Sequence, residues 1–180
     1  MKTKLVSFIG IVAILLAAPA HAALNVFACE PEWAALAAEL GGEHITAFSA
    51  TTAMQDPHRI EPRPSLIAKL RRADLMVCTG AELEAGWAPM LLRQAANHKV
   101  QPGQPGHFEA AAQVERLDIP KTLDRAQGDV HAGGNPHVHT DPRRIGVIAA
   151  RLTERLAQLD PANAASYRAR HAVFAQRWSQ

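Results

Sequence analysis

Short apolar runs alternate with segments of helical periodicity over the first half of the chain. Apolar and β-branched residues predict three strands, at residues 24–29, 44–48 and 74–78. Helical patterns follow each of them, at residues 31–40, from Pro62 or Pro64 to Arg72, and at residues 82–96. Strands that alternate with helices in this way form βαβ units. We therefore expect an α/β fold, with a parallel sheet flanked by helices.

The second half of the chain is less regular. Residues 101–106 predict a loop, residues 107–118 either a fourth strand or a short helix, and residues 128–140 a polar, histidine-rich loop. From Pro142 one helical face carries apolar residues, namely Ile145, Ile148, Ala149, Leu152, Leu156 and Leu159. After a break at Asp160-Pro161, helical spacing resumes at residues 164–178 and ends without a capping signal. We expect a protein that was cut short or one that normally continues.

Residues 1–22 have the three parts of a secretory signal peptide. Two lysines precede an apolar stretch at residues 5–18, and a small-x-small cleavage site ends at Ala22. The alternative is a membrane anchor, but this stretch is too short to cross a hydrocarbon core of about 30 Å comfortably. We expect cleavage after Ala22 and export to the periplasm. We expect no membrane insertion after cleavage, because no later apolar run is long enough.

The composition and charge exclude one class of function. The chain has 180 residues, 48% of them hydrophobic and 20% charged, which is typical of a soluble globular domain. Without residues 1–22, which hold two of the 19 basic side chains, 17 basic residues balance 17 acidic ones. A neutral chain with 5% aromatic residues lacks the charge and the stacking surface that nucleic acids require, so we exclude nucleic-acid binding.

Two cysteines, Cys29 and Cys78, each end a predicted strand. Export would expose them to an oxidising compartment, and parallel neighbouring strands would bring their ends close enough to bridge. The other interpretation is two small buried thiols. We prefer the thiols, because the geometry of a disulfide is demanding.

Histidines are the residues through which this sequence indicates chemistry. His58 follows the second predicted strand, and ligands collect at the carboxyl ends of parallel strands. Asp56 precedes it by two residues and could orient the ring by accepting its other N–H. By contrast, His44, His98, His107 and His171 stand alone, and we expect them to be surface or locally bonded residues.

A second group of histidines lies in the loop at residues 128–140. His137 repeats the local pattern of His58, with Asn-Pro-His in place of Asp-Pro-His. In an extended stretch His137 and His139 would point to opposite sides, so we do not expect them to share one ion. His131 is near enough to be a third ligand or to capture incoming metal. Imidazoles from separate loops suit Zn²⁺ or a similar ion better than Ca²⁺ or Mg²⁺.

Motifs for other chemistries are missing from the sequence. It has no phosphate-binding G-x-x-x-x-G-K-[ST], no dinucleotide-binding G-x-G-x-x-G after a strand and no G-x-S-x-G nucleophile elbow. Cys29 and Cys78 are far from a C-x-x-C spacing. We expect a protein that is not an enzyme and has no catalytic residues.

Four segments carry a resemblance to a known family. They are residues 55–65 (QDPHRIEPRPS), 73–84 (ADLMVCTGAELE), 135–142 (NPHVHTDP) and 159–178 (LDPANAASYRARHAVFAQRW). Together they resemble the periplasmic zinc- and manganese-binding proteins that deliver metal to ABC importers. The Asp-Pro-His segment of that family carries its first metal-ligating histidine, which matches His58. Its x-Pro-His-x-x-x-Asp-Pro segment carries the second, which matches His137.

The resemblance implies a domain organisation. Proteins of this family have two α/β lobes joined by one long helix, with the ion in the cleft between them. For this chain the resemblance implies a signal peptide at residues 1–22, a metal-binding lobe at 23–140 and, at 141–180, the start of the connecting helix. The second lobe, which supplies further ligands in the family, is absent from this sequence.

The resemblance also implies a cargo and a partner, namely a divalent metal ion handed to the membrane permease of an ABC importer. Two departures leave zinc and manganese both open. Residues 138–140 replace a stretch that usually contains an aromatic residue, and the long histidine-rich loop of many zinc members is reduced to His131 and its neighbours. A loop that bears a histidine favours zinc.

Two other hypotheses remain at this point. In the first, the chain is a non-functional remnant of such a carrier. In the second, it is a small exported zinc hydrolase. The hydrolase would bind zinc through His58, His137 and His131 and use Asp56 or Glu61 as its base. A hydrolase needs a carboxylate poised on metal-bound water, whereas a carrier needs a closed site and a permease.

Overall fold

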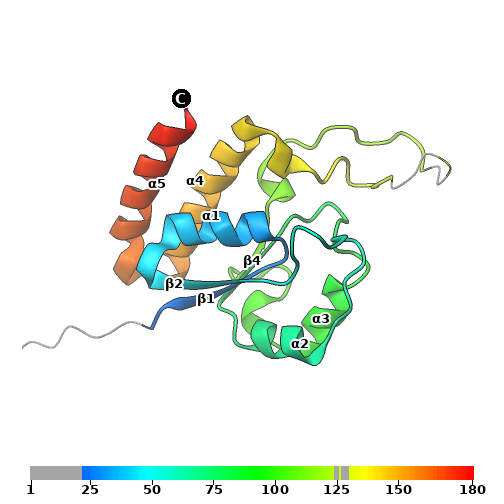
Figure 1. Ribbon diagram of the computed structural model, residues 1–180, viewed down its shortest axis with the longest axis horizontal. Coiled ribbons are helices and arrows are strands. Elements are labelled where there is room, and N and C mark those ends of the chain that lie inside the picture. The colour runs from blue at the N-terminus through cyan, green and yellow to red at the C-terminus, as the bar shows by residue number, and fades with distance from the viewer. Residues whose placement is uncertain (1–21, 124–125, 127–129) are drawn as a thin grey trace, which may run out of the picture.

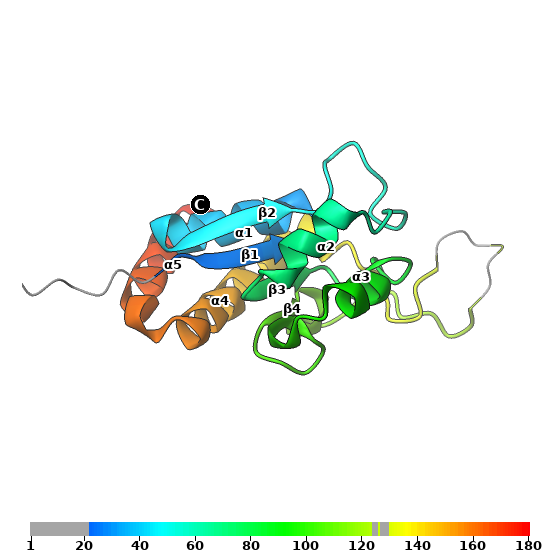
Figure 2. The same cartoon turned by 90° about the horizontal axis from the view of Figure 1, so that it is seen from below.

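The computed structural model describes residues 22–123, 126 and 130–180, so the predicted signal peptide lies outside the described residues except for Ala22. Four parallel strands form one sheet in the order β2-β1-β3-β4, as Figures 1 and 2 show. The strands are β1 (Leu24–Ala28), β2 (Ile45–Ser49), β3 (Leu75–Cys78) and β4 (His107–Glu109). The predicted fold class, a parallel sheet flanked by helices, is confirmed.

Helices cover both faces of this sheet. On one face lie α1 (Pro31–Gly41), α4 (Pro142–Leu159) and α5 (Ala164–Trp178), and on the other lie α2 (Pro64–Arg71) and α3 (Ala88–Ala95). Alternate residues of β1 divide between the two hydrophobic cores. Val26 and Ala28 pack with α1, α4 and α5, whereas Phe27 packs with α2 and α3. Strands buried on both faces are apolar throughout, which explains their clear signal in the sequence.

The C-terminal helices follow the predicted pattern. Six apolar residues of α4 form the predicted face, of which five are buried and Leu159 is half-buried. Asp160 ends the helix, and its carboxylate accepts hydrogen bonds from Asn163 and from Tyr167 of α5, each at 2.7 Å. No helix in the described part of the chain is both long and apolar enough to cross a bilayer.

The helix predicted at residues 82–96 is shorter than expected, because α3 begins only at Ala88. The preceding residues Gly80, Ala81 and Glu82 have φ angles of 76°, 50° and 71°, which are left-handed and not helical. The carboxylate of Glu84 accepts hydrogen bonds from the backbone amides of Thr79 (2.8 Å) and Gly80 (3.0 Å) and so stabilises a tight turn. This locally bonded turn replaces the first turns of the predicted helix.

The less regular middle of the chain contains both elements that the sequence left open. Residues 107–118 begin with the strand β4 and continue with a 3-10 turn, Ala111–Gln113. Residues 101–106 form the predicted loop. His107 is locally bonded, as expected, with its Nδ1 lying 2.9 Å from the Val100 carbonyl oxygen.

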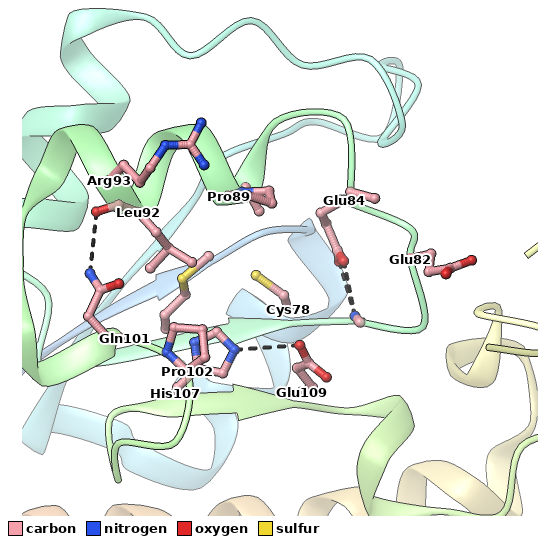
Figure 3. Close-up of a pocket in the computed structure, with 14 residues that line it drawn as sticks. Cys78, Glu82, Glu84, Pro89, Leu92, Arg93, Gln101, Pro102, His107 and Glu109 are labelled. Atoms are coloured by element: carbon pink, nitrogen blue, oxygen red, sulfur yellow. Dashed lines mark hydrogen bonds and ion pairs between the residues drawn. The ribbon is translucent and has the colours of Figure 1, made fainter. Parts of the chain in front are cut away.

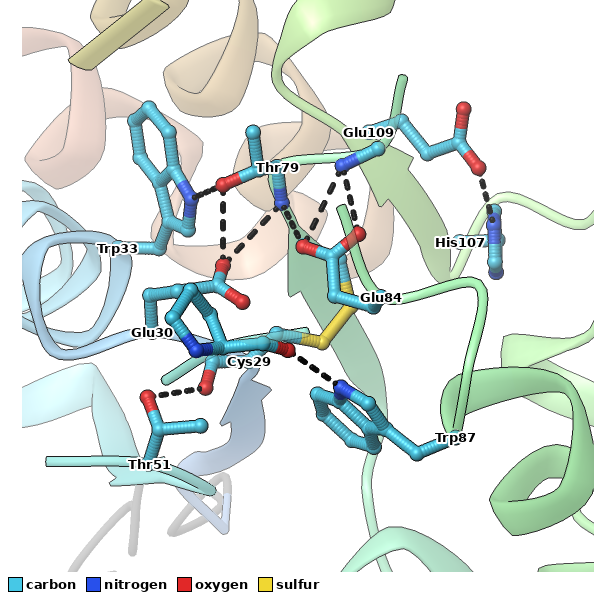
Figure 4. Close-up of a disulfide and its surroundings, with 12 residues drawn as sticks. Cys29, Glu30, Trp33, Thr51, Thr79, Glu84, Trp87, His107 and Glu109 are labelled. Carbon is cyan, nitrogen blue, oxygen red and sulfur yellow. Dashed lines mark hydrogen bonds and ion pairs between the residues drawn. A yellow bond between two sulfur atoms is a disulfide. The ribbon is translucent and has the colours of Figure 1, made fainter. Parts of the chain in front are cut away.

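The expectation of two free thiols is wrong, because Cys29 and Cys78 form a disulfide (Figure 4). Their strands, β1 and β3, are parallel neighbours, and the two Cα atoms are 4.8 Å apart. This separation lies within the range that a disulfide can span. The bond therefore joins the carboxyl ends of the two central strands.

Removing this disulfide is expected to destabilise the fold. The bond closes a loop of 49 residues, so the double variant Cys29→Ala/Cys78→Ala should lose about 2–4 kcal/mol in its free energy of unfolding. Urea denaturation followed by circular dichroism measures the loss. A reductant should destabilise the unsubstituted protein and leave the double variant unchanged. Equal stability of the double variant and the oxidised unsubstituted protein would contradict this assignment.

Candidate metal centre

Three loops meet at the carboxyl edge of the sheet. The chain runs from β1 outward to β2 and then returns to the other side of β1 as β3, so the strand order reverses between β1 and β3. Ligand sites of open α/β sheets lie beside such a reversal. Here the edge carries residues 50–63, which follow β2, residues 79–87, which follow β3, and residues 130–137.

His58 lies in the first of these loops and is oriented by Asp56. The Oδ1 atom of Asp56 accepts a hydrogen bond from the backbone amide of His58 (3.0 Å) and lies 2.8 Å from its ring Nδ1. Because a carboxylate only accepts, Nδ1 carries a proton, and in the neutral ring this arrangement leaves the lone pair on Nε2. Both bonds from His58 hold the pKa of Asp56 below its ordinary value. The expected orienting role of Asp56 is confirmed.

His137 is held by the same kind of turn. The side-chain oxygen of Asn135 accepts a hydrogen bond from the backbone amide of His137 at 3.0 Å. An Asx residue that bonds the amide two positions further on produces this turn, and the intervening proline restricts its backbone. The similarity of Asp-Pro-His and Asn-Pro-His in the sequence therefore reflects a shared local structure.

The structure brings His131 directly against His58. Their Nε2 atoms are 3.2 Å apart, and the two rings stack with centroids separated by 5.2 Å. One of the two Nε2 atoms donates to the other in this contact, and a metal ion bound by both would take the place of that proton. His131, the candidate third ligand, thus contacts His58, although 73 residues separate the two in the chain.

His137 is a neighbour of this pair. It lines a pocket of about 260 Å³ together with His131 and Asp118. Partial burial lowers the pKa of His137, and the nearby rings of His139, His131 and His58 lower it further. The three candidate ligands, His58, His131 and His137, therefore lie in one region at the edge of the sheet.

The expectation that His137 and His139 point to opposite sides is wrong. Residues Val138–Thr140 form a 3-10 turn instead of an extended strand, and the two rings meet edge to face with centroids 5.9 Å apart. His139 also lies edge-on to Trp33, and its Nδ1 is 3.5 Å from a carboxylate oxygen of Glu32. That Nδ1 atom is buried and makes no hydrogen bond.

The donor set fits a borderline metal ion. Two imidazole nitrogens bound to one tetrahedral Zn²⁺, with Zn–N bonds of about 2.0–2.1 Å, lie about 3.3 Å from each other. The Nε2 atoms of His58 and His131 are 3.2 Å apart. Among the described residues, the one group of three potential ligand atoms within 4.8 Å of one another is Cys29, Cys78 and Glu84, and its sulfur atoms are consumed by the disulfide. The three candidate histidines do not form such a group, and only His58 and His131 among them are in direct contact.

Several residues that shape this edge were not singled out by the sequence analysis. They lie in the turn at residues 79–87 or pack against it: Glu30, Glu82, Glu84 and Trp87. The helix predicted at residues 82–96 would place Glu82 and Glu84 in its first turn. The one available signal was the pair of turn-forming residues Thr79-Gly80 directly after a buried strand.

Glu30 and Glu84 form a buried carboxyl pair beside the disulfide (Figure 4). Burial raises the pKa of Glu30 to about 9, and the charge of Glu84 adds to this shift. Burial also raises the pKa of Glu84, while hydrogen bonds from Glu30 and from the amides of Thr79 and Gly80 lower it. Burial therefore favours the protonated form of Glu30 at neutral pH.

A second pocket, of about 350 Å³, lies beside α3 (Figure 3). Its walls are largely apolar and include Met76 and Leu92, with Glu84 and Glu109 among its polar residues. None of the three candidate ligands lines it. This pocket therefore borders the turn at residues 79–87 but contains none of the candidate ligands.

The parallel sheet and its covering helices form an α/β lobe whose carboxyl edge carries the histidine loops. Residues 26–180 match the family model described as "Zinc-uptake complex component A periplasmic" (ZnuA). The chain belongs to this family of metal-type solute-binding proteins.

Relatives and solved structures agree with this assignment. The chain is 28% identical over 145 residues to the metal ABC transporter substrate-binding lipoprotein ScbA of Streptococcus cristatus, covering 80% of this chain and 44% of ScbA. It is also 28% identical over 145 residues to the manganese ABC transporter substrate-binding lipoprotein PsaA of Streptococcus pneumoniae, covering 78% and 43%. A ZnuA crystal structure has the same fold, with a TM-score of 0.70 and 23% identity over 87% of this chain and 55% of that one. The chain thus spans about half the length of its relatives.

Replacing Glu30 by glutamine should flatten the pH dependence of stability. The unfolded chain releases this proton near pH 4.5 and the folded chain near pH 9, so the unfolded state binds fewer protons between them. Stability should therefore fall as pH rises through this window, by about 1.4 kcal/mol per pH unit for one such group. In Glu30→Gln this contribution is absent.

Urea denaturation at several pH values between 5 and 8.5 measures the two slopes. Glu115→Gln, which changes an exposed glutamate, is the matched control and should keep the slope of the unsubstituted protein. Parallel profiles for Glu30→Gln and the unsubstituted protein would show that Glu30 ionises normally in the fold.

Proposed function

We propose that this chain is the metal-capturing lobe of a periplasmic solute-binding protein that serves an ABC importer. The observation that carries the proposal is the pair of imidazoles from His58 and His131, whose Nε2 atoms are 3.2 Å apart at the carboxyl edge of the sheet. His137 completes the proposed set from the neighbouring pocket. In this proposal the ion is cargo, held by neutral imidazoles and then released.

We propose zinc as the cargo, with manganese as the alternative. Imidazole donors suit zinc, whereas manganese prefers carboxylates and water. The carboxylates close to the histidines are engaged with other partners, Asp56 with His58 and Glu82 with the backbone amide of Ala132. The relatives' names point both ways, since PsaA is named for manganese and the matching family for zinc uptake.

Delivery to a membrane permease is the second half of the proposal. Its support is the family, together with relatives whose names describe substrate-binding proteins of metal ABC transporters. We propose that residues 1–22 direct export to the periplasm and that residues 23–140 form the metal-binding lobe. Residues 141–180 would form the helical segment toward a second lobe, which supplies the remaining ligands.

A carrier accounts for the site better than a hydrolase does. The hydrolase hypothesis needs a carboxylate that is free to act on metal-bound water. Asp56, one of its two candidate bases, is bonded to both the backbone amide and the ring of His58. An imidazole oriented in this way by a carboxylate is a typical metal ligand.

Substituting the proposed ligands should abolish zinc binding. We expect the mature chain, residues 23–180, to bind one zinc ion, and His58→Ala or His137→Ala to lose most of that affinity. His98→Ala is the matched control, because His98 is exposed and lies in a short 3-10 segment near α3. A competitive titration of Zn²⁺ and Mn²⁺ against a chromophoric chelator measures all four proteins.

The same titration can contradict the proposal. Weak binding that neither substitution changes would mean that these histidines do not form a site in this chain. The remnant hypothesis would then take precedence. Tighter binding of Mn²⁺ than of Zn²⁺ would overturn the choice of metal and leave the carrier function in place.

Zinc affinity should fall as the solution becomes acidic. Protons compete with the metal for imidazole nitrogens, whose ordinary pKa is about 6.5. Burial lowers the pKa of His137, so this residue is neutral and available at pH 7.5. Titrations at pH 5 and pH 7.5 test the expectation, and equal affinities at the two values would exclude imidazole ligation.

A further inference from the structure

The turn at residues 79–87, between β3 and α3, contacts both histidine loops. Its Trp87 indole N–H donates a hydrogen bond to the carbonyl of Pro57 at 2.8 Å, directly before His58. Its Glu82 carboxylate accepts a hydrogen bond from the backbone amide of Ala132 at 2.7 Å, directly after His131. One short segment thus reaches the neighbour of each imidazole in the contacting pair.

The Trp87 bond is the main polar anchor of the His58 loop. Among the hydrogen bonds between described residues, those of residues 52–63 are otherwise local, apart from the contact of His58 with His131. Gly86 lies close behind this loop, since a Cβ atom at that position would be 2.9 Å from the carbonyl oxygen of His58. The turn therefore fixes the backbone of His58 by a hydrogen bond and by close packing.

The turn itself is held firmly to the sheet. Glu84 bonds the amides of Thr79 and Gly80, and Glu30 accepts a hydrogen bond from the Thr79 hydroxyl at 3.0 Å. The disulfide at Cys78 adjoins it. Figure 3 shows Glu84 bonded back into the turn, while Glu82 points away from it.

We propose that residues 79–87 are the positioning element of the metal site, with Gly86 and Trp87 placing His58 and Glu82 placing His131. The proposal rests on the metal-binding function proposed above. Glu82 acts here through the backbone of Ala132 and is not a metal ligand. The separation of the two imidazoles is then set by one rigid turn, although the histidines belong to two loops far apart in the sequence.

Two pairs of variants separate positioning from charge and from general loss of structure. Glu82→Ala removes the acceptor, whereas Glu82→Gln removes only the charge and keeps an oxygen that can bond Ala132. Gly86→Ala forces the backbone of His58 to move. Gly146→Ala, its matched control in α4, has only an ordinary contact at 3.9 Å with Trp178.

Competitive Zn²⁺ titration of the mature chain is the first measurement. Glu82→Ala and Gly86→Ala should bind zinc about 10- to 100-fold more weakly, the loss typical when a partner behind a metal ligand is removed. Glu82→Gln and Gly146→Ala should bind as the unsubstituted protein does. Equal affinity of all four variants, with binding still abolished in His58→Ala, would overturn the positioning proposal and leave the proposed function intact.

The imidazole NMR signals of the metal-free protein are the second measurement. The ring signals of His58 and His131 should change in Glu82→Ala and Gly86→Ala, and Glu82→Gln should restore them. If these two variants have lower thermal stability but unchanged ring signals, the turn stabilises the fold without positioning the imidazoles, and the proposal is overturned. If His58→Ala leaves zinc binding unchanged, the proposed function fails, and these metal-free signals still decide the positioning role.

Discussion

The parallel pairing of β1 with β3 is the constraint on which the rest of the structure depends. Because all the strands are parallel, the loops that follow β2 and β3 open at the same edge of the sheet, beside the point where the strand order reverses. The Cys29–Cys78 disulfide joins the ends of the two paired strands. From this point the turn at residues 79–87 contacts both histidine loops.

This turn has an energetic cost that the surrounding structure offsets. Ala81 and Glu82 hold left-handed backbone angles, which cost of the order of 1–3 kcal/mol each in residues other than glycine. Burying Glu30 and Glu84 side by side is a second energetic cost, because buried carboxyl groups are unfavourable without hydrogen-bond partners. The amides of Thr79 and Gly80 supply such partners to Glu84, and these hydrogen bonds stabilise the turn.

The histidine edge combines local and long-range control of its donors. Locally, Asp56 and Asn135 each bond the amide of a histidine two positions further on, and Asp56 also selects the ring tautomer. Over a longer range, the fold brings His131 to His58 across 73 residues. The first kind of control prepares each imidazole as a donor, whereas the second decides which imidazoles meet. In a proposed cargo site, loops fixed in this way reduce the rearrangement that ion binding requires.

The sequence by itself determined the features that depend on nearby residues. Apolar runs and helical periodicity predicted the parallel sheet and the α4 stripe, and Asp-Pro-His with Asn-Pro-His marked two of the candidate ligands. The tertiary structure alone decided the disulfide, the late start of α3, the meeting of His137 with His139 and the pKa of Glu30. The disulfide and the pKa of Glu30 depend on groups that come together from distant segments. The late start of α3 and the contact of His137 with His139 depend on turns, where the local pattern was equally compatible with a helix or an extended stretch. Hydrophobic periodicity predicts which face of a helix or strand is buried. Which residues pack against that face is decided only when the chain folds.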